Sequence, residues 1–505
     1  MNENIYAILA RGFPQNPDAP FLILPDGKRY SYQEMEQETA RYAHVLITSG
    51  LTQGDRVAVQ VDKSAAAIFL YLGCVRAGLA YVPINPECQS EDVDYFLNDA
   101  DAAVLVCRPD FLEKARQLAW HSAASTVFTL GMDGEGSLAE AARAQPTTFT
   151  TARCAADALA AIMYTSGTTG RPKGAMLTHR NLSSNALVLH AYWGFVVGDV
   201  ILHMLPIYHT HGLFVATHCA MLNGSPLLLE PRFDAQRALQ LLAQATVLMG
   251  VPPHYAALLN EPGLNLEACA HMRLFISGSA PLLASTFQEF RHRTGHAILE
   301  RYGMTEGGML VSNPLEGERR CGTVGFPLPG VQARVIDKQG RTLAPNQIGH
   351  IQIKGPNLFS CYWRMPQKTR DEFTPDGFFK TGDVGRMDAQ GYLTIVGRFK
   401  DVIQVGEQEV YPKEIETAID LLPGVVESAV IGLPDRITGA NVAAVVARKG
   451  TGPHPTAGDI TSALKTAFAD FKIPKAVYFV DQLPRNGMGK VQKNLLREHY
   501  RLGGL

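Results

Sequence analysis

The chain has 505 residues, which at about 150 residues per domain is roughly three domains' worth of material and can bury a sizeable core. Hydrophobic residues make up 46% and charged residues 19%, which excludes a disordered, collagen-like or coiled-coil protein. The 46 Lys and Arg against 48 Asp and Glu give a net charge of -2, so the usual electrostatic basis for binding a long nucleic acid is missing, and we expect no nucleic-acid partner.

The first half of the chain repeats a rhythm of strands and helices. Ser31 and Glu34 form a capping-box pattern that predicts a helix running towards Gly50. The hydrophobic pattern then predicts, in order, a strand at 56–61, a helix at 64–76, a strand at 80–84, a helix at 92–100 and a strand at 102–107. This alternation predicts an α/β fold with parallel sheets covered by helices, and ligands beyond the carboxyl ends of the strands.

Residues 200–229 contain no Asp, Glu, Lys or Arg and could be mistaken for a membrane span. Seven residues in this stretch would be costly in lipid, so a buried core segment is the better prediction: His203, Pro206, His209, His211, His218, Asn223 and Pro226. Eight cysteines without a C-x-x-C pair, and an N-terminus without a basic-then-apolar signal pattern, predict neither a disulfide scaffold nor secretion. We therefore expect a cytoplasmic protein without a membrane span.

The pattern changes after about residue 400. It predicts a helix at 412–422, strands at 428–432 and 441–447, a helix at 459–470 and a strand at 476–480. The segment 449–457, rich in Gly, Pro and Thr, is typical of a surface loop. These elements predict a small α+β domain of roughly a hundred residues.

The most informative segment is Thr165-Ser166-Gly167-Thr168-Thr169-Gly170-Arg171-Pro172-Lys173, which lies between an apolar run at 158–163 and a helical pattern from Thr178. A loop dense in glycine and hydroxyl groups between a strand and a helix can offer N–H and O–H donors to the phosphates of a nucleotide triphosphate. It is not a Walker loop, because Gly174 follows Lys173 where Ser or Thr would stand. From its residues alone, a plain surface loop is an equally good interpretation.

This loop resembles the signature of the adenylate-forming superfamily, which includes acyl-CoA synthetases, adenylation domains and luciferases. Five further segments resemble motifs of the same family in the same order: 205–212, 301–306, 380–383, 397–401 and 484–490. The resemblance covers nearly the whole chain. It implies a large N-terminal domain of helix-covered sheets at 1–399 and a small, mobile C-terminal domain at 400–505, with a hinge at Lys400.

The resemblance also implies a set of site residues. Lys490, delivered by the small domain, would bridge two reacting anions, and His209 would be the gate beside the acyl pocket. Thr305 is the third residue that the resemblance implies to be catalytic. ATP would contact the residues that match the nucleotide motifs: Thr165, Ser166, Gly167, Thr168, Thr169, Gly170, Lys173, Ser277, Gly278, Ser279, Tyr302, Gly303, Asp383 and Arg398. Surface lysine, solvated carboxylate and core tyrosine remain the ordinary interpretations of Lys490, Glu306 and Tyr302.

A magnesium site is implied at Glu306, with Thr165 as its hydroxyl partner, because hard Mg²⁺ prefers oxygen ligands and keeps several waters. His209 and His211 have an i, i+2 spacing that could indicate a metal pair. No third His or Cys lies nearby in the sequence to complete such a site, so we do not predict one there.

The acid that would be activated is predicted from Arg301. The stretches around it resemble the malonyl-CoA synthetase subgroup, in which this arginine is understood to pair with the second carboxylate of the substrate. An arginine fork binds a carboxylate through two hydrogen bonds, whereas a monocarboxylate would leave the buried cation unpaired at about 3–5 kcal/mol. His209, Arg301, Ser277 and Met304 are the predicted acid contacts. The alternative is that Arg301 pairs with Glu300 or another acid.

Two positions depart from that subgroup. Gly406-Glu407-Gln408-Glu409 stands where Gly-Gly-aromatic-Asn is usual, in the loop that would border the channel of the thiol, so Glu407 adds charge and restricts φ there. Gly307 stands where Thr is common and could enlarge the acid pocket.

The predicted reaction joins a short dicarboxylic acid, malonate or methylmalonate, to CoA at the expense of ATP. The alternatives are another carboxylic acid, a carrier-protein thiol as acceptor, or a nucleotide-binding protein without turnover.

Overall fold

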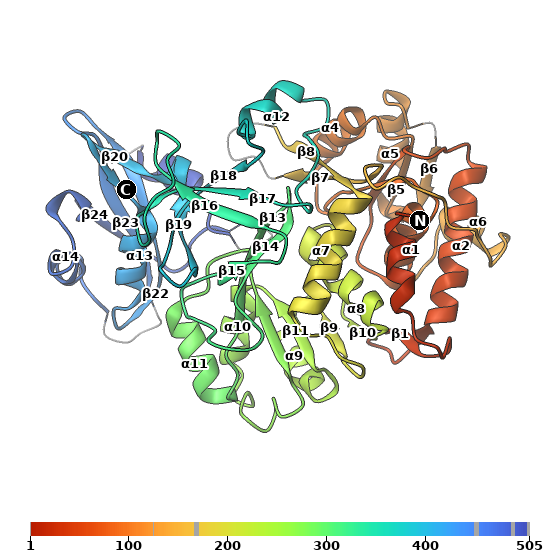
Figure 1. The fold of residues 1–505 in the computed structure, drawn as a ribbon, viewed down its shortest axis with the longest axis horizontal. Helices are drawn as coiled ribbons and strands as arrows, with labels where there is room; N and C mark the ends of the chain where they lie inside the picture. Colours follow the sequence, from red (N-terminus) through yellow and green to blue (C-terminus); the bar gives the residue numbers. More distant parts are fainter. Residues whose placement is uncertain (1, 125, 166–170, 449–453, 486–489, 502–505) are drawn as a thin grey trace.

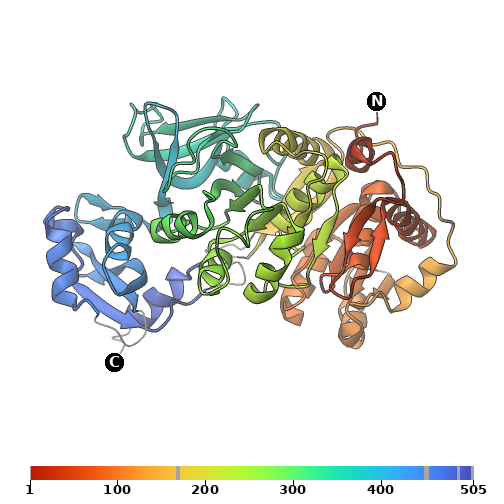
Figure 2. The same cartoon turned by 90° about the horizontal axis from the view of Figure 1, so that it is seen from below.

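The computed structural model describes residues 2–124, 126–165, 171–448, 454–485 and 490–501. Figure 1 shows a helix-covered sheet at the N-terminal end, a second sheet in the middle and a small domain at the other end, and Figure 2 shows the same order from below. The expected α/β class is confirmed.

The first sheet has six strands in the order β6-β5-β3-β4-β7-β8, and all neighbours are parallel except β7 and β8. The predicted capping box is confirmed, because the Glu34 N–H donates to Ser31 Oγ at 3.1 Å and begins α2. The strands are β3 (Arg56–Gln60), β4 (Ala80–Pro83), β5 (Val104–Cys107), β6 (Thr126–Thr129), β7 (Leu159–Thr165) and β8 (Lys173–Thr178). The helices are α2 (Tyr32–Thr48), α3 (Ala65–Arg76), α4 (Ser90–Ala100), η2 (Pro109–Phe111), α5 (Leu112–Trp120) and α6 (Ser137–Arg143).

The second sheet has nine strands in the order β15-β14-β13-β12-β11-β9-β10-β1-β2. Its middle is parallel from β13 to β1, and antiparallel strands close both edges. The strands are β1 (Pro20–Ile23), β2 (Arg29–Ser31), β9 (Ile201–His203), β10 (Leu227–Leu229), β11 (Val247–Gly250), β12 (Leu274–Ser277), β13 (Leu299–Met304), β14 (Gly308–Ser312) and β15 (Phe326–Pro327). The helices are α1 (Ile5–Leu9), η1 (Ala10–Gly12), α7 (His179–Tyr192), η3 (His211–Ala216), α8 (Thr217–Asn223), α9 (Ala235–Leu241), η4 (Leu242–Gln244), α10 (Pro252–Leu259) and α11 (Ala284–Thr294).

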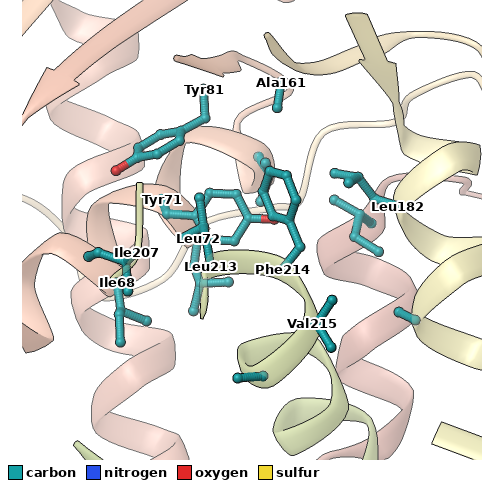
Figure 3. Packing of buried hydrophobic residues seen from close by; sticks show 14 of the residues in the cluster. Ile68, Tyr71, Leu72, Tyr81, Ala161, Leu182, Ile207, Leu213, Phe214 and Val215 are labelled. Carbon is teal, nitrogen blue, oxygen red and sulfur yellow. The ribbon is translucent and has the colours of Figure 1, made fainter. Parts of the chain in front are cut away.

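The core lies between these two sheets. Helix α3 is buried along all 12 of its residues, and one hydrophobic cluster joins it to strands of both sheets. Figure 3 shows its residues Ile68, Tyr71 and Leu72 beside Leu213 and Phe214 of η3. The apolar stretch 200–229 therefore belongs to the core, as predicted, and no helix in the described part of the chain has the length and apolar character needed to cross a membrane.

A four-stranded antiparallel sheet, β16-β17-β18-β19, follows the second sheet and was not predicted. It is the teal layer at the top of Figure 2, and it consists of β16 (Gln332–Ile336), β17 (Gly349–Lys354), β18 (Phe379–Met387) and β19 (Leu393–Arg398), with α12 (Pro366–Glu372) beside it. The strand-and-helix rhythm stops before this region, because antiparallel strands need only short turns between them.

The predicted small domain has its first strand after η5 (Phe399–Asp401). Two hydrophobic clusters of described residues contain only residues from Ile403 onward, while the boundary at 399/400 stays a prediction for this domain. Its strands are β20 (Ile403–Val405), β21 (Gln408–Val410), β22 (Val425–Asp435), β23 (Gly439–Arg448) and β24 (Ala476–Val480). Its helices are α13 (Pro412–Asp420), α14 (Ala457–Lys465), η6 (Asp470–Lys472) and α15 (Lys493–Arg501).

The helix predicted at 459–470 is shorter than expected. It ends at Lys465, where the Thr466 hydroxyl donates to the Ala463 carbonyl at 2.7 Å and competes with continuation of the helix. The loop predicted at 449–457 lies partly outside the described residues, since 449–453 are not described.

Candidate active site

The sequence pattern predicts a strand before the phosphate loop and a helix after it. In the structure, strands lie on both sides of the loop, so this prediction is wrong. Thr165 of β7 pairs with Lys173 of β8 in an antiparallel ladder, and α7 starts only after Thr178. The segment after the loop is a strand because most of its residues are buried in the sheet: Gly174, Ala175, Leu177 and Thr178. Ser166, Gly167, Thr168, Thr169 and Gly170 lie outside the described residues, so their predicted role stays a prediction.

Glu306 lies beside the base of this loop. The hydroxyl of the buried Tyr362 donates to Glu306 Oε1 at 2.8 Å, and Lys173 Nζ lies 4.4 Å from the centre of the same tyrosine ring. One carboxylate with the hydroxyl of Thr165 is a donor set that fits Mg²⁺, which proteins hold through one or two carboxylates together with phosphates and water. The described residues contain no cluster of three or more His, Cys, Asp or Glu that could hold a metal through protein ligands alone.

Asp383 and Arg398 face each other across β18 and β19, with their side chains joined by an ion pair of 2.8 Å between Arg398 Nε and Asp383 Oδ1. The Tyr302 hydroxyl donates to the other carboxylate oxygen, Asp383 Oδ2. Burial raises the pKa of Asp383, whereas the charge of Asp383 raises the pKa of Arg398. The three predicted nucleoside contacts are therefore brought together by strands about 80 and 95 residues apart in the sequence.

The predicted adenine wall is the turn that follows β12. Ser279 has φ of 71°, a left-handed conformation that is uncommon for a residue with a side chain and that occurs at functional turns. A Cβ atom added to Gly278 would lie 2.3 Å from the guanidinium carbon of Arg301, so only glycine lets the backbone approach this cation.

Arg301 is a buried cation without a carboxylate partner. It is 3% exposed, its Nε and Nη2 atoms have no hydrogen-bond partner within the described part of the chain, and no carboxylate there lies within ion-pair distance. Burial lowers its pKa to about 9. The alternative pairing with Glu300 is wrong, because Glu300 points elsewhere and accepts from the Leu282 N–H at 3.1 Å.

Two more buried polar groups lack partners near Arg301. Neither Ser277 Oγ nor the two ring nitrogens of His211 have a hydrogen-bond partner among residues that the structure describes. The charge of Arg301 lowers the pKa of His211 after burial, which places the two side chains close together. Buried donors without partners are costly, so this arrangement points to an anionic ligand that would satisfy them.

His211 begins η3, a π-helical turn of a kind that is frequent at functional sites, and His209 lies two residues before it. Burial and the charge of Lys490 lower the pKa of His209 to about 4, so its ring is neutral at physiological pH. Met304 pairs with Gly308 in the β13–β14 hairpin, and Gly303 lies so close to the Gly308 carbonyl oxygen that a Cβ would approach it to 2.2 Å.

Thr305 lies in the turn of this hairpin, directly before Glu306. The expectation for Gly307, which follows Glu306, is wrong. A Cβ there would lie 2.8 Å from Leu310 and 3.0 Å from Leu358, so the missing side chain affects packing against these leucines and does not widen the acid pocket.

Lys490 of the small domain lies at this site. It is exposed overall, yet its pKa is lowered, first because the surrounding protein removes part of its hydration and next because of the charge of Arg398. Asp383 and Glu306 act on it in the opposite direction. The ammonium is therefore within electrostatic reach of Asp383 and Arg398, the predicted nucleoside contacts, and of Glu306, the predicted magnesium ligand.

The predicted acceptor loop connects β20 and β21. Gly406 has φ of 58°, and the next residue, Glu407, is exposed. Glu409 Oε1 forms an ion pair of 2.6 Å with Lys338 of the large domain, and the Tyr411 hydroxyl donates to Glu409 Oε2 at 2.7 Å. Lys400, the predicted hinge residue, lies in η5 between the two domains.

Sequence reasoning missed His211 and Tyr362 as site residues. A histidine inside a charge-free stretch was a usable signal for His211, because a polar group buried in a core requires a reason. No local pattern identifies Tyr362, which reaches Glu306 from 56 residues away in the sequence.

Comparison with known proteins agrees with this geometry. A family model described as AMP-binding enzyme matches residues 9–363, and another described as AMP-binding enzyme C-terminal domain matches residues 414–490. Malonate--CoA ligase of Arabidopsis thaliana is 32% identical over 94% of this chain and 85% of its own length. Sulfoacetate--CoA ligase of Cupriavidus necator is 32% identical over 98% of both chains.

Among solved structures, ATP-bound MatB from Rhodopseudomonas palustris is 50% identical and matches with a TM-score of 0.97 over 100% of both chains. The apo form of MatB matches over the same length with a TM-score of 0.88. This chain therefore superposes more closely on the ATP-bound form than on the apo form.

Proposed function

The chain belongs to the AMP-binding enzyme family, and from this premise we propose that it is an acid–CoA ligase for a short dicarboxylic acid, with malonate as the first candidate. In the first half-reaction, a carboxylate oxygen attacks the α-phosphorus of ATP, the bond to the bridging oxygen breaks, and pyrophosphate leaves. In the second, the thiol of CoA attacks the acyl carbonyl carbon, its proton is lost to solvent, and AMP leaves. The chain needs no nucleophile of its own, so its work is positioning and charge neutralisation.

The choice of a dicarboxylic acid rests on one observation: the Nε and Nη2 atoms of the buried Arg301 guanidinium have no hydrogen-bond partner among the described residues. A second carboxylate on the substrate would accept hydrogen bonds from its Nε and Nη2, and Ser277 Oγ and His211 offer further donors at the same place. Paired in this way, the buried cation regains the interactions that it lost with water. A monocarboxylic acid would leave these donors unsatisfied, which supports selection against it.

The adenylation step is assigned to the residues around Asp383. Asp383 would accept hydrogen bonds from the ribose hydroxyls, with Arg398 holding its carboxylate in place, and the Tyr302 ring would lie beside adenine. Lys490 would lie between the attacking carboxylate and the α-phosphate, where its charge offsets the repulsion between two anions. His209, neutral at physiological pH, would border the acyl pocket without adding a second cation.

Glu306 and Thr165 would hold a magnesium ion against the phosphates. When bound, Mg²⁺ neutralises charge that develops on the leaving pyrophosphate. Within the chain, Tyr362 orients the Glu306 carboxylate through its hydrogen bond of 2.8 Å.

The second half-reaction requires that the small domain rotate about Lys400 and withdraw Lys490. The present arrangement, with Lys490 at the site and Glu409 bound to Lys338, supports assignment of this pose to adenylation. Rotation would break the Glu409–Lys338 pair and bring the loop 406–411 towards the thiol.

Exchange of labelled pyrophosphate into ATP tests the acid directly, because it needs no thiol. We expect exchange with malonate and methylmalonate and much weaker exchange with propionate. Sulfoacetate belongs in the panel, since its sulfonate would occupy the same anion pocket. Exchange that is equal for malonate and propionate would contradict the role of Arg301, and no exchange with any acid would indicate a nucleotide-binding protein without turnover.

Glu407 and Glu409 bear on the choice of acceptor, because they would add negative charge beside the thiol channel. A carrier protein bearing a pantetheine arm is the second candidate acceptor. Comparing free CoA with a pantetheinylated carrier protein, each supplied with purified malonyl-adenylate, distinguishes them. A cytoplasmic setting remains part of the proposal, supported by eight cysteines that are all free thiols, since thiols persist in a reducing compartment.

A further inference from the structure

Lys63 is a buried lysine that the proposed mechanism does not use. It precedes α3 and is 8% exposed, and its Nζ atom lies 2.8 Å from the carbonyl oxygen and 3.0 Å from Nδ1 of His203. The carbonyl oxygen can only accept, so the lysine donates to it. Glu230 is the one carboxylate whose charge acts on the lysine, and Glu230 itself pairs with Arg237 at 3.0 Å.

His203 extends these contacts to η3. Its Nε2 lies 2.9 Å from the Gly212 carbonyl oxygen, which can only accept, so Nε2 carries the hydrogen. In a neutral imidazole Nδ1 is then an acceptor, and it receives the second hydrogen bond from Lys63. Lys63 therefore selects the ring tautomer that can hold Gly212.

Gly212 belongs to the turn that carries the acid pocket. Its carbonyl also accepts from Thr217 Oγ1 at 3.4 Å, and a Cβ on Gly212 would lie 2.2 Å from the Pro206 carbonyl oxygen. The turn is thus confined from both sides. His211 precedes Gly212 directly, and His209 lies two residues earlier.

We propose that Lys63 is a positioning residue for the acid pocket, which acts through His203 to hold the Gly212 carbonyl and thereby the turn that carries His209 and His211. This inference rests on the proposed function, because the consequence appears in the binding of the dicarboxylic acid. ATP binds at β18 and β19, outside these contacts, so Lys63 acts on the acid and not on the nucleotide.

The test is Lys63→Met, which keeps the length of the side chain and removes its donors. In pyrophosphate exchange we expect the KM for malonate to rise about tenfold or more, since small displacements of a binding group can reduce rates by up to about a hundredfold. The KM for ATP should change less than about twofold. Lys63→Arg, which keeps donors, should recover part of the affinity for malonate.

Arg76→Met is the matched control. Arg76 lies at the other end of α3, is 7% exposed and donates to the carbonyls of Glu36 and Phe149 and to Thr39 Oγ1. Its loss should lower the thermal midpoint without changing the ratio of the two KM values. Equal changes of that ratio in Lys63→Met and Arg76→Met, or no change in Lys63→Met, would overturn the proposal.

If Lys63→Met does not fold, two variants of His203 test whether the contact with Gly212 positions the acid pocket. His203→Gln keeps an N–H donor for Gly212 and His203→Phe removes it, so the KM for malonate should rise more in the phenylalanine variant. A KM that is equal in both would refute the positioning role. Failure of wild-type protein to exchange pyrophosphate with malonate would instead refute the proposed function, so the two failures are distinguishable.

Discussion

Replacement of Arg301 by methionine is the most direct perturbation of the acid pocket. The methionine fills most of the space beside Gly278 and removes the charge. In the wild type, malonate would place its second carboxylate against Nε and Nη2, which no described residue satisfies. In the variant, that carboxylate enters a buried site without a counter-charge, whereas propionate loses no partner.

The magnitude follows from the burial of the pair. Removing one partner of a buried ion pair costs about 3–5 kcal/mol. At about 1.4 kcal/mol for each factor of ten, kcat/KM for malonate should fall by about a hundredfold to a few thousandfold. The value for propionate should stay the same or rise, because the variant no longer holds an unpaired cation in the empty part of the pocket.

The folding stability should respond in the opposite direction. Replacing a buried charge that has no partner by an apolar side chain of similar volume is often neutral or stabilising. Arg301→Met should therefore keep or raise the thermal midpoint without ligand. Arg273→Met is the control, because Arg273 pairs with the buried Asp199 at 2.6 Å and its loss leaves that carboxylate uncompensated, which should lower the midpoint.

The assay is pyrophosphate exchange with malonate and propionate, combined with thermal unfolding of the ligand-free protein. The reasoning is refuted if Arg301→Met keeps the wild-type preference for malonate over propionate. It is also refuted if the ligand-free variant is strongly destabilised, since Arg301 would then have a partner within the fold.

Three further predictions concern other parts of the site. Lys490→Ala should slow adenylation by about 10²–10³-fold, the range for loss of one electrostatic stabiliser, and leave thiol attack on supplied malonyl-adenylate nearly unchanged; equal loss of both would contradict domain rotation. Burial raises the pKa of Glu300 to about 7 from 4.5, so the folded form binds more protons between these pH values and stability falls as pH rises through the window. Glu300→Gln should abolish this fall, seen as a thermal midpoint above wild type at pH 8 but not at pH 4, and parallel curves would refute it. Glu409→Gln breaks the ion pair with Lys338. Because exposed pairs contribute less than about 1 kcal/mol, pyrophosphate exchange should fall less than about fivefold, and thioester formation should be kept or accelerated. A larger loss in the thiol step would show that Glu409 acts in the second pose.

Much of the secondary structure followed from local rules. The helix that begins at Ser31 and the strand at 476–480 appear where capping and alternation predict them, because both signals depend on neighbouring residues. The antiparallel pairing of β8 with β7 did not follow, since the mixed polar and apolar residues of Lys173–Thr178 carry no clear strand pattern of their own. The four-stranded sheet β16–β19 was not predicted either, because its strands do not follow the strand-and-helix alternation of the first half of the chain.

The order of the motifs from Thr165 to Lys490 determined the family and the expected chemistry without coordinates, because each motif is a short segment that carries its residue types in the sequence. Only the tertiary structure decided that Arg301 has no hydrogen-bond partner for Nε and Nη2 among the described residues, that His211 lies close to it, and that Lys63 contacts His203, which in turn contacts Gly212. These relations join residues 9 to 140 positions apart, and they depend on how the chain is folded and buried. A side chain's charge is set by its own chemistry, but whether that charge is satisfied depends on the neighbours that the fold brings to it.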